Sequence, residues 1–74
     1  MESKVTELDL HGERHSDVDR LVENFIYLNQ DKFPLTVICG NSILMLQRVL
    51  HTTQRIGCET SMYRYGTITV HRFK

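Results

Sequence analysis

Cysteine is scarce in this chain, which holds only Cys39 and Cys58 among its 74 residues. A secreted domain of this size usually relies on more cysteines in a regular pattern, so we expect two reduced thiols rather than a disulfide. The two cysteines and four histidines also lack the ligand spacings of zinc sites, such as C-x-x-C or H-x-x-x-H. The sequence therefore predicts no structural metal site and indicates no cofactor. It does not decide whether a divalent cation takes part in the function.

Long apolar runs are absent as well, since the longest extend over only a few residues. A membrane-spanning helix needs about 20 consecutive apolar residues, so we expect no contact with a membrane. The N-terminus is polar and charged and lacks the apolar centre of a signal peptide. We therefore expect a cytoplasmic protein that forms one domain over residues 1–74, with a monomer as the default.

Net charge is also absent, but the charged residues are unevenly distributed along the chain. Residues 1–40 carry eight acids and four bases, whereas residues 41–74 carry one acid and five bases. The basic half could present a patch to the phosphates of a nucleic acid, although its charge is far below that of a typical nucleic-acid-binding domain. Alternatively, the two halves form solvated faces that attract each other within the fold. On charge alone we favour the second interpretation.

The first half of the chain has the pattern of a strand followed by a helix. Residues 5–10 alternate as in a short strand, and a polar link over residues 12–15 follows. Ser16 is a good helix cap, and apolar residues then recur at helical spacing until Pro34 forces an end near residues 29–31. The apolar stripe consists of Val18, Leu21, Val22, Phe25, Ile26 and Leu28.

The pattern then repeats with a second strand and a second helix. Leu35–Cys39 is a nearly continuous apolar run, which is typical of a strand buried on both faces of a sheet. A helix follows, with Asn41 or Ser42 available to cap its start and Gly57 suited to its end.

The tail of the chain predicts a β-hairpin, because residues 59–73 alternate around Gly66. The element order is therefore β-α-β-α-β-β, which indicates the α/β class. A strand-helix-strand unit places its two strands parallel through a right-handed crossover. The carboxyl ends of the first two strands should then share one edge of the sheet.

The residues best suited to ligand binding or catalysis lie at that edge. They are Asp9, His11 and Gly12 after the first strand, and Gly40, Asn41 and Ser42 after the second. Asp9 and His11 are two positions apart, so a strand would aim both side chains at one place. The free N–H groups at the start of the second helix favour an anion such as phosphate. This edge therefore fits phosphate recognition or phosphodiester chemistry.

The motif Leu8-Asp9-Leu10-His11-Gly12, with this element order and a second strand ending in Gly40, resembles the Smr (small MutS-related) domain family. The resemblance extends from about Val5 to Phe73 and suggests a minimal, stand-alone member. It implies a two-layer α/β sandwich with a four-stranded mixed sheet and two helices, similar to the C-terminal domain of translation initiation factor three. It also implies binding of DNA or RNA, and in several members a nicking endonuclease or ribonuclease activity.

Within the family motif, the acid and the histidine are the residues tied to cleavage, and here they are Asp9 and His11. His11 would act as a general acid or base, while Asp9 would orient it, activate water or hold a metal. Alternatively, His11 stabilises its loop through a hydrogen bond to a backbone carbonyl, and the Asp9 carboxylate accepts hydrogen bonds from backbone N–H groups of that loop. The family's second motif is a glycine-rich loop, of which only Gly40 is retained, because Asn41 replaces a basic residue and Ser42 a second glycine.

Basic residues near the first motif and on the hairpin are further candidates for phosphate contacts. They are Arg14, His15, Arg64 and Arg72. Tyr63 and Tyr65 could in addition stack on unpaired bases. For each of these residues the alternative is a solvated loop or packing at the edge of the sheet.

Three functions stay open at this point. The chain could bind and cleave nucleic acid, bind it without cleavage, or serve as a protein-interaction module, which its neutral charge and small size would suit. The departure of Gly40-Asn41-Ser42 from the family pattern weakens cleavage more than binding, because Asn41 and Ser42 still offer hydrogen bonds.

Overall fold

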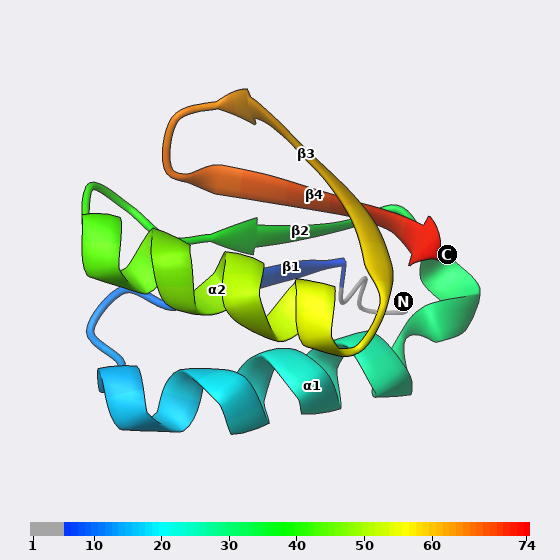
Figure 1. Cartoon of the computed structure of the whole chain (residues 1–74), viewed down its shortest axis with the longest axis horizontal. Helices are drawn as coiled ribbons and strands as arrows, with labels where there is room; N and C mark the ends of the chain where they lie inside the picture. Colours follow the sequence, from blue (N-terminus) through cyan, green and yellow to red (C-terminus); the bar gives the residue numbers. More distant parts are fainter. Residues whose placement is uncertain (1–5) are drawn as a thin grey trace, which may run out of the picture.

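The computed structural model describes residues 6–74, in which two strand-helix units are followed by a hairpin (Figure 1). Short 3₁₀ turns, η1 and η2, lie on either side of the first helix. In chain order the elements are β1 (Glu7–Asp9), η1 (His15–Asp17), α1 (Val18–Leu28), η2 (Gln30–Lys32), β2 (Leu35–Ile38), α2 (Ile43–Arg55), β3 (Cys58–Arg64) and β4 (Thr67–Phe73). The predicted element order is confirmed, although Val5, where the first strand was predicted to begin, lies outside the described residues.

The four strands form one mixed sheet in the order β1-β2-β4-β3. β1 and β2 pair in parallel, whereas β4 is antiparallel to both of its neighbours. The hairpin therefore inserts its second strand beside β2 and leaves β3 at the margin of the sheet. This arrangement confirms the expected four-stranded mixed sheet with two helices.

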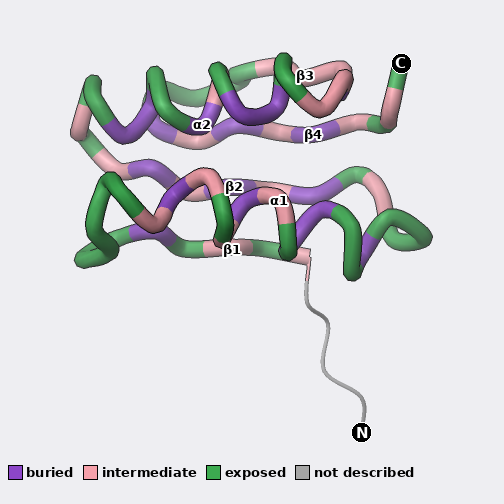
Figure 2. The backbone as a smooth tube through the Cα atoms, turned by 60° about the horizontal axis from the view of Figure 1, so that its bottom comes forward, coloured by how far each residue is buried: buried purple, intermediate pink, exposed green. Residues whose placement is uncertain are grey.

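Both helices lie side by side on one face of the sheet, which makes the fold a two-layer sandwich (Figures 1 and 2). Figure 2 shows buried positions recurring along α1 and α2 and alternating with less buried ones along β4. In β2, Leu35 and Val37 are buried, but Thr36 and Ile38 are only half-buried. The prediction that this strand is buried on both faces is wrong, because both helices of residues 6–74 lie on the opposite face from Thr36 and Ile38 (Figure 1).

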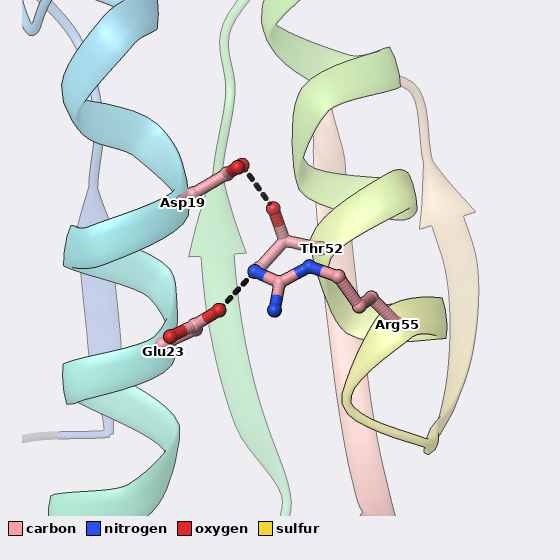
Figure 3. A network of polar contacts seen from close by, with 4 residues as sticks. All are labelled: Asp19, Glu23, Thr52 and Arg55. Atoms are coloured by element: carbon pink, nitrogen blue, oxygen red, sulfur yellow. Dashed lines mark hydrogen bonds and ion pairs between the residues drawn. The ribbon is translucent and has the colours of Figure 1, made fainter.

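Side-chain contacts tie the two helices together. The hydroxyl of Thr52, a fully buried residue of α2, donates a 2.5 Å hydrogen bond to the carboxylate of Asp19 on α1 (Figure 3). One turn farther along both helices, Arg55 forms an ion pair with Glu23. The hydrogen bond and the ion pair thus connect successive turns of α2 to successive turns of α1.

The hairpin is irregular near its open end. The pairing of β3 with β4 skips His71, so the alternation of side chains on β4 reverses after this residue. Phe73 consequently turns toward the helices. Its ring stacks on Tyr27 at 5.7 Å between centroids and meets Phe33 edge-on at 5.5 Å.

The start of α1 differs from the prediction, since the Ser16 hydroxyl does not cap it. Residues 15–17 form η1, which runs directly into α1. The N–H of Asp17 donates to the carbonyl of Arg14 at 3.0 Å, and the N–H of Val18 donates to the carbonyl of His15. Backbone carbonyls thus take the place of a side-chain cap. At the other end Leu28, which was predicted to belong to the apolar stripe, is strongly exposed.

Candidate functional site

Three connections meet at one end of the sheet, which we call the carboxyl edge. They are residues 10–14 after β1, residues 39–42 between β2 and α2, and residues 65–66 between β3 and β4 (Figure 1). The parallel pairing of β1 with β2 aligns the first two connections, and the N–H of Leu10 extends this pairing by donating to the carbonyl of Ile38 at 2.9 Å. The predicted meeting of the two motifs at one edge is therefore confirmed.

Asp9 and His11 are linked through the backbone. β1 ends at Asp9, and one oxygen of its carboxylate accepts the backbone N–H of His11 at 2.9 Å. His11 lies in the turn that follows, with Gly12 in the left-handed conformation at φ +84°. Both Asp9 and His11 are exposed. The Asp9 carboxylate therefore accepts a backbone N–H of the following loop, which stabilises the turn that carries His11.

Ser42, rather than Asn41, caps the N-terminus of α2. Its hydroxyl accepts the backbone N–H of Met45 at 3.1 Å. The N–H groups of Ile43 and Leu44 precede the first helical hydrogen bond and have no partner within the helix. Together with the helix dipole they give this end of α2 the capacity to bind an anion.

The hairpin turn is packed against the loop that begins α2. The N–H of Cys39 donates to the carbonyl of Gly66 at 2.7 Å. A Cβ atom placed on Gly66 would lie 2.3 Å from the carbonyl oxygen of Gly40, so only glycine permits this approach. At Gly40, by contrast, a Cβ atom would meet nothing within 4 Å. Glycine is favoured there because the backbone has a positive φ of +74°.

Arg64 belongs to the same edge as Asp9. Strand pairing aligns Asp9 with Ile38, Ile38 with Thr67, and Thr67 with Arg64, and cross-strand partners share one face of a sheet. Three inter-strand spacings separate Asp9 from Arg64 by about 14 Å. Within residues 6–74, Arg64 has no acidic partner at ion-pair distance. The row thus has a negative end on β1 and a positive end on β3.

The remaining predicted site residues lie in different places. Arg14 is exposed at the end of the connection after β1, and His15 is exposed at the start of η1, which follows directly. Arg72 lies toward the opposite end of the hairpin, where it forms a 2.8 Å ion pair with Glu59. The structure therefore brings Arg64 to the edge and leaves Arg72 away from it.

Sequence reasoning missed the exposed apolar side chains at this edge. Ile43 and Leu44 form the first turn of α2 and are 59% and 62% exposed. Their signal in the sequence is their position off the apolar stripe of the helix. Farther along α2 there is a shallow hollow of about 280 Å³, which is lined by Leu44, Gln47, Arg48 and His51.

The cysteines do not supply a nucleophile to this edge. Cys39 and Cys58 are both buried free thiols, as predicted. Burial raises the pKa of the Cys39 thiol to about 11, and burial also raises the pKa of Cys58. Although Cys39 directly precedes Gly40, its thiol is therefore protonated at neutral pH and unreactive.

Histidine, cysteine and acidic side chains are dispersed over residues 6–74, and no three of them gather as a metal site would require. No helix in the same residues combines the length and apolar character needed to cross a membrane.

Comparisons of the chain with protein-family models, with curated proteins and with solved structures gave no match. The resemblance to the Smr family therefore depends on the Leu8–Gly12 motif and on the order of the elements.

Proposed function

We propose that this chain is an Smr-like domain that binds DNA or RNA through phosphate groups at the carboxyl edge. The observation that supports this proposal is the alignment of the Asp9–Gly12 turn with the N-terminus of α2. A phosphate over the first turn of α2 would accept hydrogen bonds from the N–H groups of Ile43 and Leu44. The positive end of the helix dipole would further stabilise its binding. The exposed Asn41 could donate its side-chain amide to the same phosphate, and Arg64 could hold a neighbouring one.

Cleavage of a phosphodiester is the more demanding form of this proposal. His11 is the residue we assign to proton transfer, because a histidine can take up and return a proton near neutral pH. Asp9 is assigned to positioning, because its carboxylate already accepts the backbone N–H of His11. Binding should therefore survive the loss of the His11 ring, whereas cleavage should not.

Titration of fluorescein-labelled RNA and DNA oligonucleotides with the purified chain tests binding. We expect an affinity that falls as salt rises, because contacts to phosphates release counterions. In ¹⁵N NMR spectra, the ligand should shift the amide signals of residues 10–12 and 40–44. Shifts confined to the opposite end of the sheet, around residues 57–60, would contradict the proposed site.

Two substitutions of the helix cap separate binding from folding. Ser42→Asp keeps an oxygen that can cap α2 but adds a negative charge where the phosphate would sit. We expect it to abolish binding and to leave the melting temperature nearly unchanged. Ser42→Ala is the matched control, since it removes the cap without adding charge and should lower the melting temperature while retaining binding. Tight binding by Ser42→Asp would show that the phosphate lies elsewhere.

Three substitutions at the first motif test cleavage of structured RNA and of supercoiled DNA. His11→Ala should abolish cleavage and retain binding. Asp9→Asn keeps an acceptor for the His11 N–H and should retain most of the activity, whereas Asp9→Ala removes the acceptor and should lose it. Cleavage that persists in His11→Ala would refute the role of this residue. Binding without any cleavage by the unmodified chain would leave the domain as a non-catalytic nucleic-acid-binding module.

A further inference from the structure

We infer that the carboxyl edge takes single-stranded nucleic acid, whose unpaired bases stack on Tyr63 and Tyr65. This inference rests on the proposed function and names the class of nucleic acid that the same edge would hold. Tyr63 is 79% exposed and Tyr65 is 57% exposed. Neither ring is buried against the sheet as a packing role would require, and exposed aromatic side chains commonly mark binding surfaces.

The hairpin turn holds Tyr65 beside the anion-binding end of α2. Tyr65 directly precedes Gly66, whose backbone is in contact with Gly40 and is bonded to the N–H of Cys39. A nucleotide whose phosphate sits on the first turn of α2 would therefore have its base within reach of the Tyr65 ring.

Tyr63 contacts one neighbouring ring on β4. Its ring meets the ring of His71 edge-on, with 6.1 Å between centroids, and His71 shares a 2.8 Å hydrogen bond with the hydroxyl of Ser61. These contacts lie on the face of the sheet that the helices leave uncovered. The contact with His71 narrows the orientations of the Tyr63 ring, which lowers the conformational entropy that the ring would lose when a base stacks on it.

Arg64 supplies a positive charge on the same segment as the two tyrosines. It separates Tyr63 from Tyr65 in the sequence, and within residues 6–74 it has no acidic partner. It could therefore neutralise the phosphate that joins two stacked nucleotides. Asp9 lies at the far end of the same row, about 14 Å away, so its charge does not neutralise that of Arg64.

A duplex would be held less well at this site. Its bases are stacked and paired inside the helix, so they cannot reach Tyr63 or Tyr65, and only the phosphate contacts remain. The two tyrosines consequently predict a preference for single strands over duplexes of the same sequence.

The experiment compares a labelled single strand of about 12 nucleotides, the size an aromatic groove typically covers, with the duplex made from it. Tyr63→Leu and Tyr65→Leu remove the ring but keep an apolar side chain. Each should weaken binding of the single strand by about 5- to 150-fold, which corresponds to the usual worth of one base stacked on an aromatic ring. Duplex binding should not change. Leu28→Ala is the control, because Leu28 is equally exposed at 79% but lies at the end of α1.

Because the chain contains no tryptophan, its intrinsic fluorescence reports the tyrosines directly. Single strands should quench this fluorescence in the unmodified chain, and most of the quenching should disappear in the double variant.

The failure of this inference can be distinguished from failure of the proposed function. If the double tyrosine variant binds single strands normally while Ser42→Asp does not, the inference is wrong and the proposed function stands. Equal losses of single-strand and duplex binding in the tyrosine variants would also refute it, as would equal affinity of the unmodified chain for both ligands. If the folded chain binds neither ligand, but a protein partner instead, the proposed function and the inference both fall.

Discussion

Replacing Gly66 with alanine should destabilise the fold far more than the same replacement at Gly57. Both residues have a left-handed backbone, with φ of +85° and +83°. They differ in their surroundings, because a Cβ on Gly66 would lie 2.3 Å from the carbonyl oxygen of Gly40, whereas a Cβ on Gly57 would meet nothing within 4 Å. The pair therefore separates the cost of backbone conformation from the cost of the steric contact.

The expected magnitudes follow from these two terms. An alanine forced into the left-handed region costs about 1–2 kcal/mol, and this is the whole effect expected for Gly57→Ala. At Gly66 the backbone of the Gly40 loop must also move to admit the methyl group, and such overpacking adds about 1–3 kcal/mol. For a domain of this size each 1 kcal/mol shifts the melting temperature by about 4–8 °C. We expect a decrease of about 20 °C for Gly66→Ala and about 10 °C for Gly57→Ala.

Thermal unfolding followed by circular dichroism measures the difference between the two variants. A second measurement connects it to function, since Gly66→Ala displaces the Gly40 loop and should weaken nucleic-acid binding at temperatures where both variants are folded. Gly57→Ala should bind normally. Equal decreases in melting temperature would refute the argument, because they would mean that the hairpin turn does not press on the Gly40 loop.

Three further substitutions test individual contacts. Thr52→Val removes the hydrogen bond to Asp19 and should lower the free energy of unfolding in urea by about 1–2 kcal/mol, whereas Thr53→Val, which loses only a bond within its own helix, should cost less than about 1 kcal/mol. Ser42→Ala should cost about 1 kcal/mol in the same assay, and an unchanged midpoint would refute its capping role. Because burial raises the pKa of Cys39 to about 11, the unfolded chain loses this proton first, and stability should fall as the pH rises from about 9 toward 11. Melting temperatures of the unmodified chain and of Cys39→Ala check this, and an equal pH dependence in both would contradict it.

The elements of this fold are largely predictable because short-range physics determines them. Pro34 excludes a helical conformation in Phe33, so the helical segment cannot continue into β2; α1 itself ends at Leu28, and η2 follows over Gln30–Lys32. Gly66 permits the tight turn between two alternating segments, so the hairpin forms where the pattern indicates. Ser16 shows the limit of such reasoning, because a capping side chain is dispensable when the preceding backbone already supplies carbonyl partners, as η1 does.

The order of the strands is not encoded in any local pattern. The alternation in residues 59–73 is compatible with either strand of the hairpin lying beside β2, and only the packed fold selects β4. Both helices lie on one face of the sheet (Figure 1), so Ile38 on the other face is only half-buried, although it belongs to a nearly continuous apolar run.

Some features of the candidate site are likewise predictable from the sequence, whereas others depend on the folded domain. The sharing of one edge by Asp9, His11 and the Gly40 loop follows from the element order alone, because a strand-helix-strand unit places its two strands parallel. The remaining features of the site depend on the folded domain: Asp9 holds the turn of His11, Gly66 packs on Gly40, and Arg64 lies at the edge while Arg72 does not. Contacts between residues distant in the chain depend on strand order and register, and these are set by the packing of the whole domain rather than by any segment of it.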